Sequence, residues 1–464
     1  MRLNVGLFND SFPPTIDGVS NTVVNYAEYI TKNHGKCTVA TPKYPHVIDD
    51  YPFEVYRYSS ADISKRIGYR VGNTLSVRTI RALYAKQFDI MHVHSPFASA
   101  IIANEIKRIC PSIPVVFTYH TKFEEDFKAR LKLPALCTAA TKLVAHNIKQ
   151  ADEVWVVSEG AAESLRNIGY KGSYRVMKNG TDFKKGKADE SAVKELKSKH
   201  GIADDETVFL FVGRMMWYKN VGLILDAIKR LPNELKYKMI FVGEGADRAA
   251  VESYAEQLGL KDNVIFTGAI TDRETVRTYF SASDLFLFPS TYDTAGLVVM
   301  EAAAVDLPSV LIDGSCAAED VVDDFSGFLC EENPKSMAEK IVKALEDKEH
   351  LKAVGKNAGK YVYLSWEDSV ARAYKRYCEI YNAYMSGVPK KSIFQKAMPS
   401  NIKSSVVSGV NKSKVAAKNA TKSAYNRAEK IKNGIVDKMD SAVSSTKSGT
   451  KTIWEFVQKQ NKHK

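Results

Sequence analysis

Two acidic and two basic residues in the second half of the chain carry its clearest chemical signal. Asp293 and Glu301 stand on either side of Gly296 in the stretch FPSTYDTAGLVVMEAAA. Arg214 and Lys219 precede them, in a loop between a predicted strand end and a predicted helix start. Arginine supplies two parallel N–H donors and lysine supplies a compact positive charge, and both suit a phosphate. The pattern therefore predicts an anion site that is bracketed by two carboxylates.

The stretch around these carboxylates is expected to fold as a strand, a tight loop and a helix. Residues 285–288 are all apolar, as in a strand that is covered on both faces. Asp293 and Thr294 are residue types that cap helices, and a helix opening at Gly296 would direct free N–H groups at an anion. Glu301 falls where this helix is apolar nearly all round, which weakens the simpler interpretation of a solvated glutamate. Its carboxylate needs a partner.

This stretch resembles the donor-site signature of retaining glycosyltransferases with the GT-B fold (glycosyltransferase family four). The resemblance rests on two acidic residues separated by seven positions after a Phe-Pro-Ser strand end, and on the glycine–arginine–lysine spacing that ends at Lys219. It implies that Glu301 holds the ribose of a nucleotide sugar, that Asp293 contacts the hexose, and that Arg214 and Lys219 bind the pyrophosphate. Asp293 replaces the glutamate that is usual in the family, which leaves the identity of the hexose open.

Further candidates lie in the first half, near the carboxyl ends of predicted strands. Gly18 follows two prolines and precedes a helix, and His120 follows an apolar strand. Taken alone, such a loop often only connects elements, and such a histidine is often structural. The resemblance implies that the Gly18 loop faces the pyrophosphate and that His120 lies beside the anomeric carbon. The implied catalytic residues are His120, Asp293, Arg214 and Lys219, and the implied donor-binding residues are Gly18, Arg214, Lys219, Asp293, Gly296, Leu297 and Glu301.

Short apolar runs alternate with helical stretches through both halves of the chain, which predicts parallel sheets with helices on both faces. Together with the resemblance, this alternation predicts the GT-B fold, with two Rossmann-like domains. The expected parts are an acceptor-binding domain at 1–183, a nucleotide-sugar-binding domain at 184–364, a helix crossing back onto the first domain at 365–390, and a basic tail, helical or disordered, at 391–464. The expected strands are 2–8, 36–41, 88–93, 115–119, 154–157, 174–177, 208–212, 239–242, 264–267, 285–288, 308–312 and 327–329.

The composition argues against a membrane-spanning, secreted or disulfide-stabilised protein. The sequence has no run of eighteen apolar residues, and its N-terminus resembles a strand more than a signal peptide. Its six cysteines are scattered without the spacing of a metal site or a disulfide framework. These features predict a cytoplasmic protein. The resemblance implies a nucleotide-sugar substrate whose departing diphosphate Arg214 and Lys219 would stabilise, so we expect no metal and no further cofactor.

The distribution of charge suggests a membrane partner. The net charge is +12, and residues 391–464, with 16 basic and 4 acidic side chains, account for all of it. Two further basic segments, 66–86 and 122–149, include apolar residues, as membrane-surface helices do. The candidate membrane or acceptor contacts are Arg66, Arg70, Lys122, Lys128, Arg130, Lys132, Trp454 and Phe456. Each segment also fits a solvated helix face or a disordered tail, and nucleic-acid binding is disfavoured because aromatic stacking platforms are missing.

The expected activity is transfer of a hexose, with glucose from UDP-glucose favoured, to a membrane lipid such as diacylglycerol. This expectation comes from the resemblance, which is strongest to diacylglycerol glucosyltransferases, and it places the enzyme peripherally on the inner face of the cell membrane. A soluble or polyprenyl-linked acceptor is the alternative. A non-catalytic scaffold that binds sugar nucleotides is a third possibility, which the full set of Arg214, Lys219 and Glu301 argues against.

Overall fold

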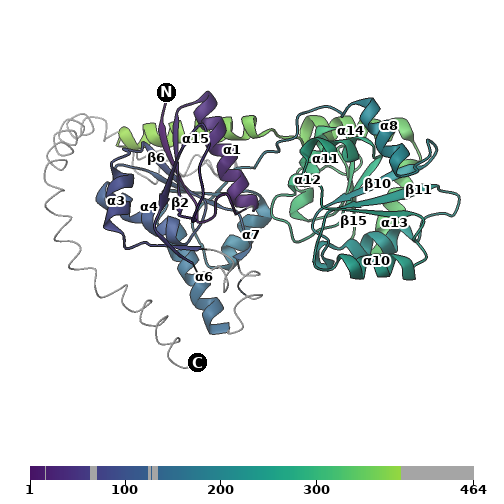
Figure 1. The fold of residues 1–464 in the computed structure, drawn as a ribbon, viewed down its shortest axis with the longest axis horizontal. Coiled ribbons are helices and arrows are strands. Elements are labelled where there is room, and N and C mark those ends of the chain that lie inside the picture. The colour runs from purple at the N-terminus through teal and green to yellow at the C-terminus, as the bar shows by residue number, and fades with distance from the viewer. Residues whose placement is uncertain (16, 63–69, 124–126, 128–133, 388–464) are drawn as a thin grey trace, which may run out of the picture. The chain divides into compact units, whose positions relative to one another are not determined.

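The computed structural model describes residues 1–387, apart from residue 16 and segments 63–69, 124–126 and 128–133 (Figure 1). Several predicted membrane contacts lie outside the described residues, and so does the whole tail from 388 onward. These contacts are Arg66, Lys128, Arg130, Lys132, Trp454 and Phe456.

The first half folds around a seven-stranded parallel sheet with the order β3-β2-β1-β6-β7-β8-β9. Its middle strands are buried and apolar, as expected of strands that helices cover on both faces. The strands are β1 (Asn4–Phe8), β2 (Lys36–Pro42), β3 (Glu54–Tyr58), β6 (Ile90–Val93), β7 (Val115–Tyr119), β8 (Glu153–Val156) and β9 (Arg175–Val176). The helices are α1 (Gly18–Asn33), α3 (Val77–Tyr84), α4 (Ala98–Ile109), α6 (Pro134–Lys149) and α7 (Glu159–Asn167).

The second half folds around a six-stranded parallel sheet with the order β12-β11-β10-β13-β14-β15. Helix α9 contacts both α10 and α13, while α11 contacts α8 and α12, and α12 also contacts α14. In Figure 1, α10 and α13 lie on one side of this sheet and α8, α11 and α14 lie on the other. The strands are β10 (Thr207–Val212), β11 (Tyr237–Val242), β12 (Val264–Gly268), β13 (Leu285–Phe288), β14 (Ser309–Ile312) and β15 (Phe328–Cys330). The helices are α8 (Glu190–Lys199), α9 (Val221–Ile228), α10 (Arg248–Gln257), α11 (Arg273–Ser281), α12 (Leu297–Ala304), α13 (Pro334–Leu345) and α14 (Lys348–Tyr361).

The two parallel sheets confirm the predicted fold class, but three strands were missed. Strand β3 is an edge strand of sequence EVYRY. Because it is partly exposed and contains polar residues, it lacks the continuous apolar run that identifies a central strand. The short strands β4 (Ser60–Asp62) and β5 (Arg70–Gly72) form a separate antiparallel pair. They are too short and too polar to show a period of two.

The last helix of the described residues, α15 (Trp366–Met385), contacts the first sheet through buried aromatic and charged side chains. The hydroxyl of Tyr374 accepts a hydrogen bond of 2.6 Å from the backbone N–H of Leu3. Tyr377 is fully buried and stacks on Trp155 of β8, with ring centroids 5.3 Å apart. These contacts attach a segment from the end of the described chain to strands at its beginning.

Candidate functional site

Lys219 and Asp293 meet where two adjacent strands of the second sheet end. Strand β10 pairs with β11 on one side and with β13 on the other, so the loops that follow β10 and β13 leave the same edge at a switch in strand order. The Lys219 ammonium donates to both carboxylate oxygens of Asp293, at 2.5 and 2.6 Å. Two residues that the sequence assigned to one site are therefore in direct contact.

Arg214 lies in the same loop as Lys219 but is exposed. Within the described part of the chain it forms no ion pair or hydrogen bond. The Lys219 ammonium, in contrast, is mostly buried and lies 6.0 Å from the Phe288 ring centroid. An anion bound in this loop could contact two cations. Lys219 would contact it from a mostly buried position, and Arg214 from an exposed one.

The helix that follows β13, α12, begins without a side-chain cap among the described residues. Gly296 at the N-cap has a φ of 53°, and a Cβ atom there would lie 2.8 Å from the Cα of Ala317, so only glycine fits. No side chain from the described residues caps α12. The expectation that Asp293 or Thr294 caps this helix is wrong. The N-cap position falls at Gly296, and the Asp293 carboxylate is bound to Lys219 instead. The free N–H groups of α12 therefore remain available to an anion.

Glu301 is buried, with 7% of its surface exposed, and its two carboxylate oxygens differ. Oε1 accepts a hydrogen bond of 2.7 Å from Arg273, whereas Oε2 is buried and has no hydrogen-bond partner among the described residues. Burial raises the pKa of Glu301, and the Arg273 guanidinium opposes that rise. The predicted need for a partner is met by Arg273, a residue that sequence reasoning missed because its contact depends on how α11 packs against α12.

Three histidines lie at the carboxyl ends of β6 and β7 in the first sheet. His94 Nδ1 lies 3.0 Å from His120 Nε2, and the two rings stack with centroids 5.2 Å apart. His92, within β6, is hydrogen-bonded to Tyr377 and Thr118. Burial lowers the pKa of all three, that of His120 to about 3, so each ring is neutral near pH 7. A neutral His120 can donate or accept a hydrogen bond without bringing a formal charge to the site.

Gly18 is the first residue of α1, and a Cβ atom there would have open space around it. The Asp17 carboxylate already caps this helix by accepting from the N–H groups of Val19 and Ser20, at 3.0 and 2.7 Å. The terminus of α1 is thus covered by a carboxylate, unlike that of α12. Contact between the Gly18 loop and a pyrophosphate remains a prediction.

The two described residues among the predicted membrane contacts, Arg70 and Lys122, both have partners within the chain. Arg70 donates to Asp62 at 2.8 Å and to the hydroxyl of Ser60 at 3.0 Å, which ties together the β4–β5 pair. The Lys122 ammonium donates to the backbone carbonyl of Thr291 at 3.4 Å. Arg70 therefore serves the local fold, whereas Lys122 lies beside the loop that carries Asp293.

Buried polar atoms that lack a hydrogen-bond partner within the described chain mark the same strand ends. At strand ends they include Asn9 Oδ1, Asp10 Oδ2, His94 Nε2 and Ser290 Oγ, and Glu301 Oε2 on α12 is a further such atom. Asn9 and Asp10 directly follow β1, and Ser290 follows β13 by two residues. Such atoms are rare in native proteins unless a ligand or water satisfies them. Sequence reasoning missed Asn9, Asp10 and Ser290, although polar residues directly after apolar strands were a usable signal.

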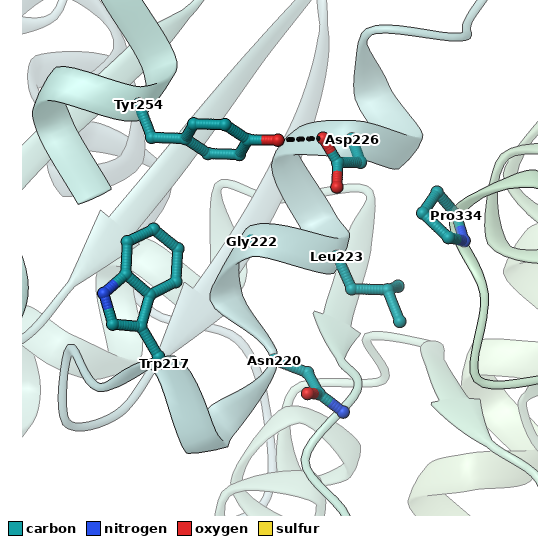
Figure 2. Close-up of a pocket in the computed structure, with 7 residues that line it drawn as sticks. All are labelled: Trp217, Asn220, Gly222, Leu223, Asp226, Tyr254 and Pro334. Carbon is teal, nitrogen blue, oxygen red and sulfur yellow. Dashed lines mark hydrogen bonds between the residues drawn. The ribbon is translucent and has the colours of Figure 1, made fainter. Parts of the chain in front are cut away.

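A shallow pocket of about 510 Å³ borders the short 3-10 helix at Trp217–Lys219 (Figure 2). Tyr254 and Asp226 line it and share a hydrogen bond of 2.7 Å. Its lining residues are Trp217, Asn220, Gly222, Leu223, Asp226, Tyr254 and Pro334. Because neither Arg214 nor Lys219 lines it, this pocket is distinct from the predicted phosphate site.

Among the described residues, no group of three or more histidine, cysteine, aspartate or glutamate side chains could hold a metal ion.

Both halves of the chain match family models. Residues 16–185 match the model described as Glycosyltransferase Family 4, and residues 192–361 match the one described as Glycosyl transferases group 1. The chain is similar to alpha-monoglucosyldiacylglycerol synthases from Streptococcus pneumoniae and Acholeplasma laidlawii. It is 28% identical to the first over 69% of this chain and 74% of the relative, and 24% identical to the second over 81% and 96%.

Other similar proteins differ in what their names describe. A GDP-mannose-dependent alpha-mannosyltransferase from Mycobacterium tuberculosis is 26% identical over 70% of this chain and 83% of the relative. Among solved structures, sucrose-phosphate synthase from Thermosynechococcus elongatus has a TM-score of 0.67 at 21% identity, covering 82% of this chain and all of that one. Anabaena HepE in complex with UDP-glucose has a TM-score of 0.62 at 17% identity with the same coverage. These structures establish the shared fold.

Among the described residues, none of the helices has the length and apolar character required to cross a membrane.

Proposed function

Because this chain belongs to the GT-B glycosyltransferases, with a family 4 domain and a group 1 domain, we propose that it transfers glucose from UDP-glucose to a membrane lipid such as diacylglycerol. The observation that carries the proposal is the convergence of Lys219, Asp293 and the uncapped α12 terminus at one edge of the second sheet. This arrangement joins a cation, free N–H groups and a carboxylate that can bind sugar hydroxyls.

The reaction breaks the bond between the anomeric carbon and the diphosphate, joins that carbon to an acceptor oxygen, and releases the acceptor's hydroxyl proton. Negative charge therefore grows on the departing diphosphate. Lys219, Arg214 and the N–H groups at Gly296 and Leu297 would stabilise that charge as fixed donors, without reorganising during the step. No metal is needed for this role.

The other predicted residues would hold the ribose of the departing nucleotide and the sugar that is transferred. Glu301 would bind the ribose through its unpartnered Oε2, and His120 would lie beside the anomeric carbon. The diphosphate would compete with Asp293 for Lys219. In the loaded enzyme Asp293 would then turn to the hexose hydroxyls, and the sugar would be transferred with retention of configuration.

The lipid acceptor and the membrane location depend on different observations. The names of the Streptococcus and Acholeplasma relatives support a diacylglycerol acceptor, and the UDP-glucose bound to Anabaena HepE supports the donor. The net positive charge of residues 391–464 suits an anionic membrane surface, which supports peripheral binding at the inner face of the cell membrane.

Product analysis tests this proposal. The full chain is incubated with vesicles of diacylglycerol and anionic phospholipid and with radiolabelled UDP-glucose, UDP-galactose or GDP-mannose, and the lipids are separated by thin-layer chromatography. We expect a labelled glycolipid with UDP-glucose and little with the other two donors. A labelled lipid only with GDP-mannose would overturn the donor assignment, and labelled product only from polyprenyl phosphate or a soluble sugar would overturn the acceptor.

A further inference from the structure

Arg273 contacts one oxygen of Glu301 and leaves the other free. The Arg273 guanidinium donates to Glu301 Oε1 at 2.7 Å, while Oε2 remains buried and unpartnered in the described chain. Glu301 projects from an eight-residue helix whose neighbouring side chains are apolar. A carboxylate in such surroundings strongly favours acceptance of a hydrogen bond at its open oxygen.

The guanidinium itself is held on two further sides. Its Nε donates to Asp182 Oδ2 at 2.9 Å, and one terminal nitrogen is shared between Asp182 Oδ1, at 2.5 Å, and Glu301. The guanidinium carbon lies 4.3 Å from the ring centroid of Phe183. A two-point bond to a carboxylate together with an aromatic face fixes the plane of an arginine far better than either contact alone.

The backbone that carries Arg273 is fixed as well. Arg273 is the first residue of α11, and the preceding Asp272 caps that helix by accepting from the N–H of Thr275 at 2.7 Å. Asp182 and Phe183 precede α8, which packs against α11. Arg273 is therefore anchored through its backbone and through one edge and one face of its guanidinium.

We propose that Arg273 is a positioning residue for nucleotide recognition: it occupies Glu301 Oε1 and orients the carboxylate so that Oε2 accepts a hydrogen bond from a ribose hydroxyl. The inference rests on the proposed function, in which Glu301 binds the ribose. The positive charge of Arg273 also opposes the rise in the pKa of Glu301 that burial and the Asp182 charge cause. It acts through Glu301 and not by contact with the donor.

The test compares three nucleotides on the full chain. Calorimetry measures the dissociation constants of UDP, 2′-deoxy-UDP and 3′-deoxy-UDP for wild type and for Arg273→Met, which keeps apolar contact with Phe183. A hydroxyl that donates to a charged acceptor is worth about tenfold or more in affinity. We expect wild type to lose at least that factor with one of the deoxy analogues. Arg273→Met should bind UDP more weakly, and its own loss with that analogue should shrink to less than about threefold.

A matched control and two milder variants separate positioning from general structure. Arg277→Met removes an arginine one turn further along α11, whose guanidinium binds Glu274 and the carbonyl of Gly186, and we expect it to keep the wild-type ratio of affinities. Arg273→Lys keeps the charge but loses the planar fork, and Asp182→Asn weakens one anchor, so both should give intermediate ratios. In turnover assays Arg273→Met should raise KM for UDP-glucose with little change in kcat, because a ribose contact is made equally in ground and transition states.

The outcomes distinguish this inference from the proposed function. If wild type does not bind UDP at all, the proposed function fails. If wild type distinguishes UDP from its deoxy analogues and Arg273→Met does so equally well, the positioning role is overturned while the enzyme assignment stands. An equal loss of affinity for all three nucleotides in Arg273→Met would also overturn it, since that pattern indicates general damage. Should Arg273→Met fail to fold, wild-type ratios in both Arg273→Lys and Asp182→Asn would overturn it.

Discussion

The Lys219 ammonium lies 2.5 and 2.6 Å from the two carboxylate oxygens of Asp293, a residue 74 positions further along the chain. The resemblance to the glycosyltransferase family implies that these residues contact different parts of one donor, Lys219 the diphosphate and Asp293 the hexose. In the structure they neutralise each other. If the donor diphosphate binds Lys219 as proposed, donor binding exchanges one ion pair for another. Removal of either residue leaves the other with an uncompensated charge.

Lys219→Ala should therefore impair catalysis more than Arg214→Ala. The lysine change removes one fixed donor to the leaving group and also leaves the Asp293 carboxylate free to repel it. Loss of a single such donor costs about 3–4 kcal/mol in the barrier, or about 10² to 10³ in kcat. Turnover with UDP-glucose measures the effect, and exposed Lys229→Ala is the matched control. Near-normal turnover in both Lys219→Ala and Arg214→Ala would remove the phosphate assignment.

Asp293→Glu should change the preference for the donor hexose. The substitution restores the residue that is usual in the family and extends the carboxylate by one methylene, beyond the position at which Asp293 bonds Lys219. We expect the ratio of kcat/KM for UDP-glucose over UDP-galactose to shift. A ratio equal to that of wild type would show that the shorter side chain does not select the sugar.

The buried histidines should make the protein less stable at mildly acidic pH. Burial lowers the pKa of His92, His94 and His120, whereas in the unfolded chain each titrates near its usual value of 6.5. Below about pH 6.5 the unfolded state therefore binds more protons than the folded state, so the free energy of unfolding falls as the pH falls. Each such histidine contributes up to about 1.4 kcal/mol per pH unit, and for His120 this continues down to its pKa of about 3.

Urea unfolding at pH 7, 6 and 5 measures this dependence. His120→Asn should reduce the slope of the unfolding free energy against pH by about 1.4 kcal/mol per pH unit, which corresponds to one proton. His146→Gln, at an exposed position on α6, should leave the slope unchanged. Equal slopes in wild type and His120→Asn would contradict the assignment of a neutral, buried imidazole.

The fold was predictable because central parallel strands are continuous apolar runs, as in the LFLF of β13. Edge strand β3 was not predictable in this way, because its residues are partly exposed and do not form a continuous apolar run. The candidate site likewise has a part that was predictable from the sequence and a part that was not. Asp293 and Lys219 follow from spacing within loops, whereas the contact of Arg273 with Glu301 and that of His94 with His120 depend on the packing of separate elements. Sequence spacing locates residues on an element but does not specify which distant side chain meets them.

The final prediction concerns residues 391–464, which lie outside the described residues and hold the net positive charge of the chain. Each lysine near an anionic membrane contributes about 1 kcal/mol of attraction, and Trp454 and Phe456 would add hydrophobic anchoring. We expect the full chain to co-sediment with vesicles of anionic phospholipid, less so as salt is raised, and weakly with neutral phosphatidylcholine. A chain that ends at Pro389 should still bind UDP but remain in the supernatant. If this shorter chain sediments as well as the full one, the tail is not the anchor, and the basic segments 66–86 and 122–149 become the surfaces to mutate next.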